Sequence, residues 1–369
     1  MKILILANND VGLYKFRKEL IESFINQGHE VYISLPKGEY VTSLEMMGCQ
    51  YIRTEFDRRG MNPLKDLKLV TFYWKTIKKI SPDVVLTYTI KPNIYGGIIC
   101  TLKHVPYLTN ITGLGTAIEN ESILSRILMI MYKLAIGKSA NVFFQNAENK
   151  TYFEEKHLVK DNTSLIPGSG VNLNEHAFEE YPQEDGAIRF LFVGRIMKDK
   201  GIGELLECAK EIYKKQLNVR FDILGGFDEE VYRNTITELE QKEILKYYGH
   251  QNDVHAFIKS HHATILPSYH EGLSNVLLET AATGRPILAS NIAGCKETFE
   301  EGISGIGFEP KDGKSLFLAV ERFIELPYDK KRMMGIRGRE KMEKQFDRNI
   351  VIKAYGDQID KIKEKKSNV

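Results

Sequence analysis

Cysteine is scarce in this sequence, and the few cysteines lie far apart from one another. Four occur in 369 residues, at Cys49, Cys100, Cys208 and Cys295, and no two of them form a C-x-x-C motif. Disulfide-rich domains and zinc sites need clustered or regularly spaced cysteines. We therefore expect reduced, buried thiols in a cytoplasmic protein rather than a disulfide framework or a zinc site.

The sequence also lacks a marked excess of charge and any apolar run long enough to span a bilayer. Its 51 Lys and Arg residues nearly balance 49 Asp and Glu residues, so the global charge gives no reason to expect nucleic acid as a partner. The N-terminus, MKILILANND, has the pattern of a strand and a loop rather than of a signal peptide. A transmembrane or secreted protein is not expected.

The most apolar stretch, residues 123–140, is interrupted by Arg126, Lys133 and Lys138. A span through hydrocarbon needs about 20 predominantly apolar residues, so these charges argue against one. The pattern fits an amphipathic helix lying in a membrane interface. It fits equally well a core helix whose charged side chains reach water at the ends, and both interpretations remain open.

Both halves of the chain alternate apolar strand patterns with helical patterns. KILILA at 2–7 opens the first series, and IRFLFV at 188–193 opens the second after a polar stretch at 172–187. Continuous apolar strands separated by helices predict parallel sheets that are covered by helices on both faces. We expect an α/β protein with two doubly wound domains, at residues 1–175 and 186–348.

Two glutamates eight positions apart, Glu271 and Glu279, surround a predicted helix start. Ser274 is in position to cap a helix over residues 275–282. A helix N-terminus attracts phosphate, and a carboxylate beside it is suited to accept hydrogen bonds from sugar hydroxyls. The segment predicts a site for a sugar attached to phosphate, at the carboxyl end of a strand. The alternative is that Glu271 is a first-turn helix charge and Glu279 a solvated surface residue.

Arg195 and Lys200 follow a strand pattern that ends at Gly194. Arg presents a planar fork to phosphate and Lys adds a mobile charge, so the two can stabilise a leaving diphosphate as its charge grows. The sequence has no D-x-D between apolar strands of the kind used to hold manganese, and no G-x-G-x-x-G of dinucleotide-binding enzymes after the first strand. We therefore expect neither a metal ion nor NAD, and no other cofactor.

The two motifs together resemble a known family. In HEGLSNVLLE, Glu271 and Glu279 resemble the E-x7-E signature of retaining GT-B glycosyltransferases of glycosyltransferase family four, and GRIMKDKG at 194–201 resembles the G-R-x4-K-G phosphate clamp of that family. The resemblance extends over nearly the whole chain. It implies the GT-B fold, in which two Rossmann-like domains face a cleft. It also implies that residues 1–175 bind the acceptor, that residues 186–348 bind a nucleotide sugar, and that a last helix at 349–369 crosses back to the first domain.

By this resemblance, Glu271 contacts the transferred sugar, Glu279 holds the ribose, and Arg195 and Lys200 hold the diphosphate. The catalytic set is then Glu271, Arg195 and Lys200. The other donor-binding candidates lie in loops and at strand ends: Gly12, Gly194, Gly226, Gly249, His250, Gly272, Leu273, Ser274 and Asn275. Leu273 and Ser274 are expected to offer backbone N–H groups to phosphate, and Gly12 to let the backbone approach the ligand closely. His250 alone is better explained as an ordinary surface-loop histidine.

The acceptor side is predicted from strand-end segments of the first half. Arg58, Arg59 and Lys91 are the candidates for a lipid pyrophosphate, with ordinary loop cations as the alternative. Thr112 and Gly113 occupy a turn where some relatives carry a histidine near the donor sugar, so the role of that histidine does not transfer. These segments are similar to those of bacterial transferases that extend undecaprenyl-diphosphate-linked sugars, including the GalNAc transferases of N-glycan assembly and capsule enzymes.

Positive charge gathers in the first half even though the whole chain is nearly neutral. Residues 58–103 carry nine Lys or Arg residues against two acids, Asp66 and Asp83. This excess predicts attraction to an anionic membrane or to a pyrophosphate-bearing acceptor. For residues 65–79 the alternative is a solvated helix face.

We therefore expect a cytoplasmic, membrane-peripheral, metal-independent, retaining glycosyltransferase. The resemblance implies transfer of a hexose or N-acetylhexosamine, GalNAc or GlcNAc being favoured, from a UDP-sugar onto a polyprenyl-diphosphate-linked saccharide. Three alternatives stay open: a relative with a small soluble acceptor, a GT-B-shaped UDP-sugar 2-epimerase, and a non-catalytic sugar-nucleotide-binding protein. The clamp at Arg195 and Lys200 followed by Glu271 and Glu279 disfavours the epimerase.

Overall fold

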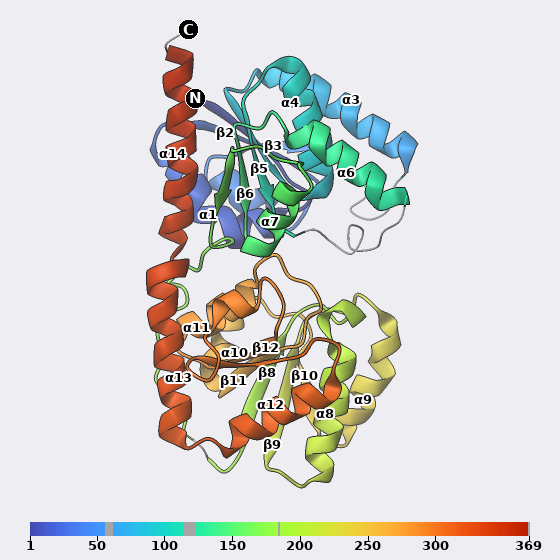
Figure 1. The fold of residues 1–369 in the computed structure, drawn as a ribbon, viewed down its shortest axis with the longest axis vertical. Coiled ribbons are helices and arrows are strands. Elements are labelled where there is room, and N and C mark those ends of the chain that lie inside the picture. Colours follow the sequence, from blue (N-terminus) through green and yellow to red (C-terminus); the bar gives the residue numbers. More distant parts are fainter. Residues whose placement is uncertain (56–61, 114–122, 184, 368–369) are drawn as a thin grey trace. The chain divides into compact units, whose positions relative to one another are not determined.

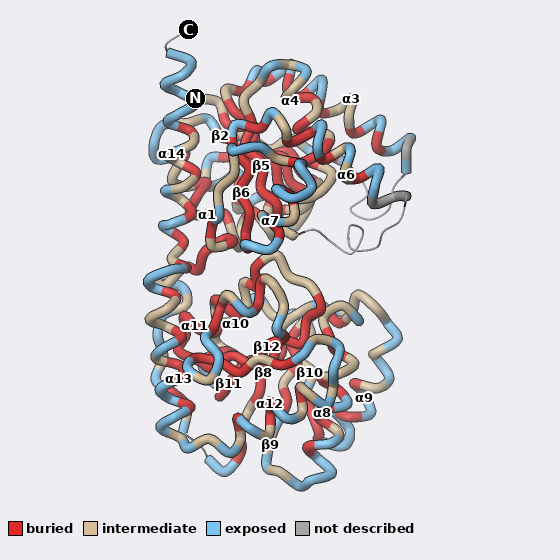
Figure 2. Tube along the Cα trace, viewed as in Figure 1, coloured by how far each residue is buried: buried red, intermediate tan, exposed pale blue. Residues whose placement is uncertain are grey.

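The structure, a computed structural model, describes residues 1–55, 62–113, 123–183 and 185–367 and divides into two compact units (Figure 1). The first unit comprises Met1–Ser169 and Asn349–Val369, and the second comprises Gly170–Arg348. Each unit has its own parallel sheet, whose strands are largely buried (Figure 2). These are the two α/β units that the alternating strand and helix patterns predict.

The first unit is built on a seven-stranded parallel sheet in the order β3-β2-β1-β4-β5-β6-β7. Its strands β4 and β5 are buried at every position, in agreement with their mainly apolar sequences, VVLTY and YLTNI. The order runs outward from β1 in one direction and then from β4 in the other, as in a doubly wound sheet. The strands are β1 (Lys2–Leu6), β2 (Glu30–Leu35), β3 (Gln50–Arg53), β4 (Val84–Tyr88), β5 (Tyr107–Ile111), β6 (Asn141–Phe144) and β7 (Thr163–Leu165).

Helices connect these strands. Three of them, α3, α4 and α6, pack side by side in the first unit (Figure 1). The helical segments of the first unit are α1 (Asp10–Asn26), α2 (Val41–Met46), α3 (Pro63–Ile80), the π-helical turn η1 (Pro92–Gly96), α4 (Gly97–Lys103), α6 (Ile123–Ile136), α7 (Ala147–Glu155) and α14 (Arg348–Ser367).

The last helix, α14, belongs to the first unit although it follows the second in sequence. Its buried residues recur every three or four positions, at Val351, Tyr355, Ile359 and Ile362, and they join the core that contains β1 and β2. At its far end, Lys366 Nζ binds Asp83 Oδ1 at 2.7 Å, directly before β4. The segment that, by the family resemblance, crosses back is therefore held to the first unit along its length.

The second unit is built on a six-stranded parallel sheet in the order β10-β9-β8-β11-β12-β13. The chain moves outward from β8 to β10 and then returns to place β11 on the other side of β8. The strands are β8 (Ile188–Val193), β9 (Val219–Leu224), β10 (Leu245–Tyr247), β11 (Ala263–Leu266), β12 (Ile287–Ser290) and β13 (Gly305–Phe308). The α-helices are α8 (Ile202–Lys214), α9 (Arg233–Gln241), α10 (Val254–Ser260), α11 (Asn275–Ala282), α12 (Gly313–Glu325) and α13 (Tyr328–Lys341).

The boundary between the units lies earlier in the sequence than predicted. The polar stretch at 172–187 belongs to the second unit and does not link two domains. Arg285 holds its backbone in place. This residue is buried, and its guanidinium donates hydrogen bonds to the carbonyl oxygens of Glu179 and Glu180, each at 2.8 Å. Because these bonds depend on a residue about one hundred positions away, local composition does not reveal them.

The chain enters the second unit at Gly170 and leaves it at Arg348, and these two ends touch. The N–H of Arg348 donates to the carbonyl oxygen of Val171 at 3.1 Å, and its guanidinium donates to that of Gly170 at 3.3 Å. Gly170 has φ +64°, and a Cβ there would lie 2.5 Å from the Arg348 Cα. Only glycine fits this crossing without a backbone shift.

Helix α6 has a buried face and also exposed apolar residues. Leu128, Tyr132 and Ala135 are buried in the unit, whereas Ile130 and Leu134 are more than half exposed. Across the described ranges, no helix is both long enough and apolar enough to cross a bilayer. The four cysteines are free and buried, as the sequence predicts.

Candidate active site

The sheet topology of the second unit brings the two predicted motifs together. Arg195 and Lys200 follow β8, and Glu271 follows β11, which is hydrogen-bonded to β8. The strand order reverses between β8 and β11: β9 and β10 extend the sheet on one side of β8, and β11, β12 and β13 extend it on the other. The loops at the carboxyl ends of such a pair diverge and form the crevice in which open α/β sheets bind ligands.

Glu271 is held by two donors from opposite sides. Lys200 Nζ forms a short ion pair with Glu271 Oε1, and the Ser268 hydroxyl donates to the same oxygen at 2.8 Å. The side chains of Lys200 and Glu271 are 20% and 13% exposed, so the pair is shielded from water. Glu271 Oε2 makes no hydrogen bond to any residue of the described ranges, which leaves this oxygen able to accept one from a ligand hydroxyl.

Gly201 allows the loop that carries Lys200 to pack closely against the loop that carries Glu271. Gly201 follows Lys200 with φ +66°, and a Cβ there would lie 2.0 Å from the Pro267 carbonyl oxygen. The N–H of Tyr269 also donates to the Asp199 carbonyl at 2.9 Å. The loop after β8 is therefore fastened to the loop after β11, and Lys200 is set beside Glu271 by the backbone.

Two ionisable side chains near Glu271 are kept neutral. Burial, followed by the nearby Glu271 carboxylate, raises the pKa of the Cys295 thiol well above its usual range. Burial also raises the pKa of Tyr269, and the hydrogen bond that its hydroxyl donates to Glu204 adds to the shift. Neither side chain offers a nucleophilic anion at neutral pH.

The start of α11 agrees with the sequence in its bounds but not in all of its hydrogen bonds. Ser274 occupies the N-cap position, as predicted, yet its side chain makes no capping bond. The resemblance implies that the Ser274 N–H is available to phosphate, but this group donates to the Gly294 carbonyl at 2.9 Å. The cause is the loop after β12, where Gly294 has φ +82° and its Cβ position lies 2.7 Å from the Gly272 carbonyl oxygen. The N–H of Leu273 makes no hydrogen bond within the described ranges.

Arg195 lies at the same sheet edge but has a carboxylate partner that the sequence does not indicate. Its guanidinium donates to Asp228 Oδ2 at 2.7 Å, while 57% of its side chain stays exposed. Asp228 follows β9, beyond the predicted residue Gly226. The guanidinium is therefore accessible, whereas its partner Asp228 is mostly buried, with a side chain 21% exposed.

The loops after β8, β9 and β10 are joined through glycines. Gly225 has φ +142°, and a Cβ there would lie 1.8 Å from the Gly194 carbonyl oxygen. Its N–H donates to the Gly249 carbonyl at 2.8 Å, and the N–H of Ile196 donates to Gly226 at 2.9 Å. Gly194, Gly226 and Gly249 thus lie together at one edge of the sheet, as predicted, and Gly226 has open space above its Cα.

Glu279 lies on α11 beside a histidine that sequence reasoning missed. The Glu279 carboxylate is 4.0 Å from His176 Nε2, and the His176 ring meets that of His255 edge-on at 5.5 Å between centroids. The ring of His255 in turn contacts the hydroxyl of Thr283 and the Glu179 carboxylate, each at 3.3 Å. His176 comes from the polar stretch that resembles a linker, so no local signal marks it.

The remaining predicted donor residues differ in their surroundings. Asn275 begins α11, and its buried Oδ1 has no hydrogen-bond partner within the described ranges. His250 is exposed in the loop after β10. Gly12 lies in the first unit, inside the first turn of α1, where its N–H is taken by the Asn9 side chain at 2.6 Å. This capping bond leaves Gly12 without the open N–H that a ligand-binding loop would offer.

The predicted acceptor residues are only partly described. Arg58 and Arg59 lie outside the described residues. Lys91 Nζ binds Asp66 Oδ1 at 2.8 Å, and the two side chains are 13% and 10% exposed. The interpretation of Lys91 as an open cation for pyrophosphate is therefore not supported, because a buried local partner already neutralises it. Thr112 and Gly113 directly follow β5 at the carboxyl edge of the first sheet.

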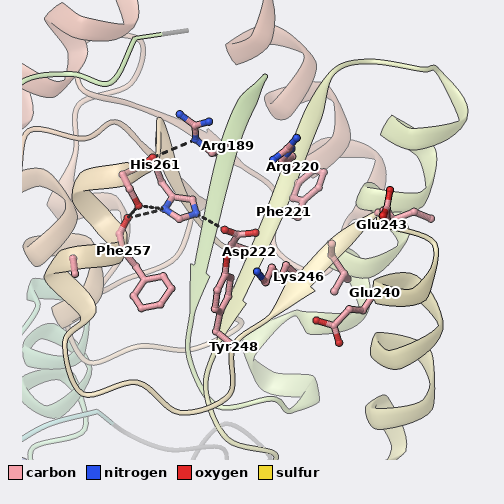
Figure 3. Close-up of a pocket in the computed structure, with 14 residues that line it drawn as sticks. Arg189, Arg220, Phe221, Asp222, Glu240, Glu243, Lys246, Tyr248, Phe257 and His261 are labelled. Carbon is pink, nitrogen blue, oxygen red and sulfur yellow. Dashed lines mark hydrogen bonds and ion pairs between the residues drawn. The ribbon is translucent and has the colours of Figure 1, made fainter. Parts of the chain in front are cut away.

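A large hollow in the second unit does not contain the predicted site. It measures about 800 Å³ and is lined by residues of β8, β9, β10 and α10 and by His261, whose ring contacts the Asp222 carboxylate at 2.9 Å (Figure 3). None of the predicted donor-binding residues lines it. Within the described ranges, no three His, Cys, Asp or Glu side chains are grouped so that they could hold a metal ion.

Two family models match the chain, one in each half. Residues 2–146 match the model described as glycosyl transferase 4-like, and residues 174–341 match the model described as glycosyl transferases group 1. The matches leave out residue 1, residues 147–173, which include α7 and β7, and residues 342–369. The chain belongs to the glycosyltransferases that these two models describe. Its two parallel-sheet units have the GT-B fold.

Curated relatives of this glycosyltransferase cover most or nearly all of the chain. It is 24% identical to the N,N'-diacetylbacillosaminyl-diphospho-undecaprenol alpha-1,3-N-acetylgalactosaminyltransferase of Campylobacter jejuni, over 96% of this chain and 97% of the relative. It is 27% identical to the UDP-Gal:alpha-D-GlcNAc-diphosphoundecaprenol alpha-1,3-galactosyltransferase of Escherichia coli, over 72% and 73%. The solved structure of Anabaena HepE in complex with UDP and glucose shares the fold, with a TM-score of 0.79 at 16% identity over 98% and 99% of the chains.

Proposed function

We propose that this glycosyltransferase moves a hexose or N-acetylhexosamine from a UDP-sugar onto a polyprenyl-diphosphate-linked saccharide, with retention of the anomeric configuration and without a metal ion. The observation that carries the proposal is the Lys200–Glu271 pair at the switch point between β8 and β11, with Arg195 on the same edge. One cation and one carboxylate are thus held side by side, an arrangement that suits a ligand in which a phosphate is joined to a sugar.

The proposed roles follow from these contacts. The diphosphate takes the place of the Asp228 carboxylate on Arg195 and shares Lys200 with Glu271. As the bond between the sugar C1 and the diphosphate oxygen breaks, the two cations stabilise the negative charge that grows on the leaving UDP. The acceptor hydroxyl attacks C1 from the same face and gives its proton to the departing phosphate, so the transfer needs no separate base. Glu271 Oε2 accepts a sugar hydroxyl, and Glu279 accepts the ribose hydroxyls.

The substrate class rests on the relatives. Both curated relatives are named for acceptors that end in diphosphoundecaprenol, and one is named for UDP-Gal as donor. The HepE structure holds UDP and glucose in the same fold. We extend this chemistry to the present chain as a UDP-sugar donor, with GalNAc or GlcNAc favoured, and a lipid-linked acceptor.

A lipid-linked acceptor requires access to a membrane, and the first unit has a face suited to it. We define the membrane face as the exposed apolar residues of α3, α4 and α6 together with the lysines among them. Its apolar members are Leu64, Leu67, Trp74, Leu102, Ile127, Ile130 and Leu134, between 40% and 75% exposed. Its lysines are Lys65, Lys68, Lys75, Lys78, Lys79, Lys103 and Lys133. Exposed apolar side chains and lysines on the same three helices suit an anionic lipid surface, so we propose a cytoplasmic protein bound peripherally to the membrane.

The test of the proposed function is transfer itself. UDP-sugars are screened by UDP release with undecaprenyl-diphosphate-linked saccharides, and the product anomer is determined by NMR. We expect transfer to persist in EDTA. Glu271→Gln should abolish transfer, because the substitution removes the negative charge of the carboxylate while leaving the side-chain size unchanged. Thermal unfolding of the variant should stay near that of the parent protein.

Other outcomes would contradict the proposal in distinct ways. Sugar epimerisation without acceptor consumption would indicate the 2-epimerase alternative. An inverted product anomer would refute the retaining mechanism, and activity lost in EDTA but restored by manganese would refute metal independence. Near-normal turnover of Glu271→Gln would remove Glu271 from the catalytic set.

A further inference from the structure

The first unit contains a cavity that the proposed reaction does not use. It measures about 890 Å³ and lies at the amino ends of β5, β6 and β7, the edge of the sheet opposite to the strand-end loops that bind ligands in this class of fold. The last turns of α14 line it from one side through Gln358, Lys361 and Lys365. None of the residues assigned to the donor or the acceptor lines it.

The cavity has a strong excess of positive charge. Four lysines line it, Lys138, Lys361, Lys365 and Lys366, against a single acid, Asp161. Lys366 is neutralised by its ion pair with Asp83. The other three form no ion pair with any residue in the described ranges. Lysines that line one hollow repel one another, and an anion bound among them relieves that repulsion.

A buried amide at the same place lacks a hydrogen-bond acceptor. Asn141 lines the cavity, is only 4% exposed, and begins β6. Its Oδ1 accepts from the Ser164 hydroxyl at 3.1 Å, but its Nδ2 has no partner within the described ranges. A buried donor without an acceptor is costly, and native proteins contain few of them. An oxygen-rich ligand in this cavity would satisfy the amide.

We propose that this cavity is a second anion site, which binds a phosphate group through Lys138, Lys361 and Lys365 together with the Asn141 amide. Lysines bind phosphate as mobile point charges, which suits a site whose cations come from separate segments. The volume is within the range of small-molecule sites, so the phosphate can carry an attached group. The same chemistry is offered by a soluble phosphate ester and by a phosphomonoester lipid headgroup.

The decisive measurement is hydrogen–deuterium exchange of the full chain with pyrophosphate, in the presence of excess UDP so that the donor site is occupied. Pyrophosphate should protect residues 138–141, 161–164 and 358–366. Lys361→Gln with Lys365→Gln should weaken binding by about tenfold or more, since hydrogen bonds to charged groups are worth at least that factor. Lys353→Gln with Lys363→Gln changes the same charge on α14 outside the cavity and should leave binding unchanged.

A second arm separates the two sources of phosphate. Vesicles of phosphatidylcholine with phosphatidic acid should protect the same three segments if the ligand is a lipid headgroup, whereas only pyrophosphate should do so if it is soluble. No protection by either probe would overturn the proposal and leave water as the partner of Asn141. Equal binding by the two lysine double variants would also overturn it. Protection near Lys200 alone would report the donor site and not this cavity.

Discussion

Ser268 lies in the loop after β11, and its hydroxyl donates to the Glu271 carboxylate at 2.8 Å. Ser290 ends β12 and is equally buried, but its hydroxyl makes no hydrogen bond within the described ranges. We expect Ser268→Ala to lower kcat by about tenfold or more, because a hydrogen bond to a charged group contributes about 1.5–3 kcal/mol. Ser290→Ala should leave kcat unchanged.

The role of Ser268 is one of positioning, so the test needs a second readout. UDP affinity, measured by calorimetry, should not change in either variant, since neither serine is expected to contact the nucleotide. An equal loss of rate in both variants would show that the effect is a general response to truncating a buried serine. Weaker UDP binding by Ser268→Ala would place Ser268 among the donor-binding residues.

At the residue scale, the sequence predicts charged groups better than it predicts their partners. The spacing of Arg195, Lys200 and Glu271 identifies groups that the fold places at neighbouring strand ends. Their contacts with Asp228 and Ser268 depend on loop geometry, and that geometry depends on backbone conformations such as the positive φ of Gly201. His176 reaches Glu279 across roughly a hundred residues of chain, so no local pattern could identify it.

At the scale of elements, Asp83 links α14 to the first residues of the chain. Its carboxylate accepts from Lys366 Nζ and from the backbone N–H of Lys2, each at 2.7 Å. Burial alone would raise the pKa of Asp83, but these two hydrogen bonds and the nearby positive charges outweigh it and lower the pKa. Because the folded-state pKa is the lower one, the contribution to stability is present above the unfolded pKa and is lost as pH falls through the folded value.

We expect Asp83→Asn to lower the free energy of unfolding at pH 7 by no more than about 1 kcal/mol, since a partly exposed ion pair is worth that or less. Urea unfolding of parent and variant at several pH values is the measurement. The difference between them should shrink as pH falls below about 4, where the Asp83 carboxylate becomes protonated. A difference that stays constant down to strongly acidic pH would show that the charge of Asp83 is not its source.

Helix bounds were predictable where capping and apolar spacing agree, as for α11 at 275–282. The spacing of Val351, Tyr355 and Ile359 likewise marks one face of a helix, although only the resemblance implies which unit it joins. The polar stretch at 172–187 misleads because its backbone carbonyls, and not its side chains, bind Arg285. Patterns of side-chain polarity carry no information about such bonds.

At the scale of the whole molecule, the membrane face predicts where the protein resides. Replacing Lys75, Lys78 and Lys79 with Glu should reduce binding to anionic liposomes in flotation assays, because attraction between surface charges depends on sign and is screened within about 10 Å at 0.1 M salt. Replacing Lys314, Lys330 and Lys344 with Glu makes the same charge change on exposed residues of the second unit and should have little effect. UDP affinity should be unchanged in both variants.

Two results would count against this face. Liposome binding that is insensitive to both sets of substitutions would place the contact elsewhere. Absence of binding at low salt, together with full activity on a water-soluble acceptor, would favour the small soluble acceptor instead.

The alternation of strands and helices predicts both units, but which helical residues face solvent depends on how α3, α4 and α6 pack together.

The contact between Gly170 and Arg348 makes the second unit an insertion within the first. The first and last residues of the second unit are hydrogen-bonded to each other, so the chain enters and leaves this unit at one point. The core of the first unit, including α14, is therefore built from two stretches of sequence, whereas the second unit is one continuous stretch. A gene segment that encodes residues 170–348 could therefore be exchanged as a single piece without interrupting the sequence that builds either sheet.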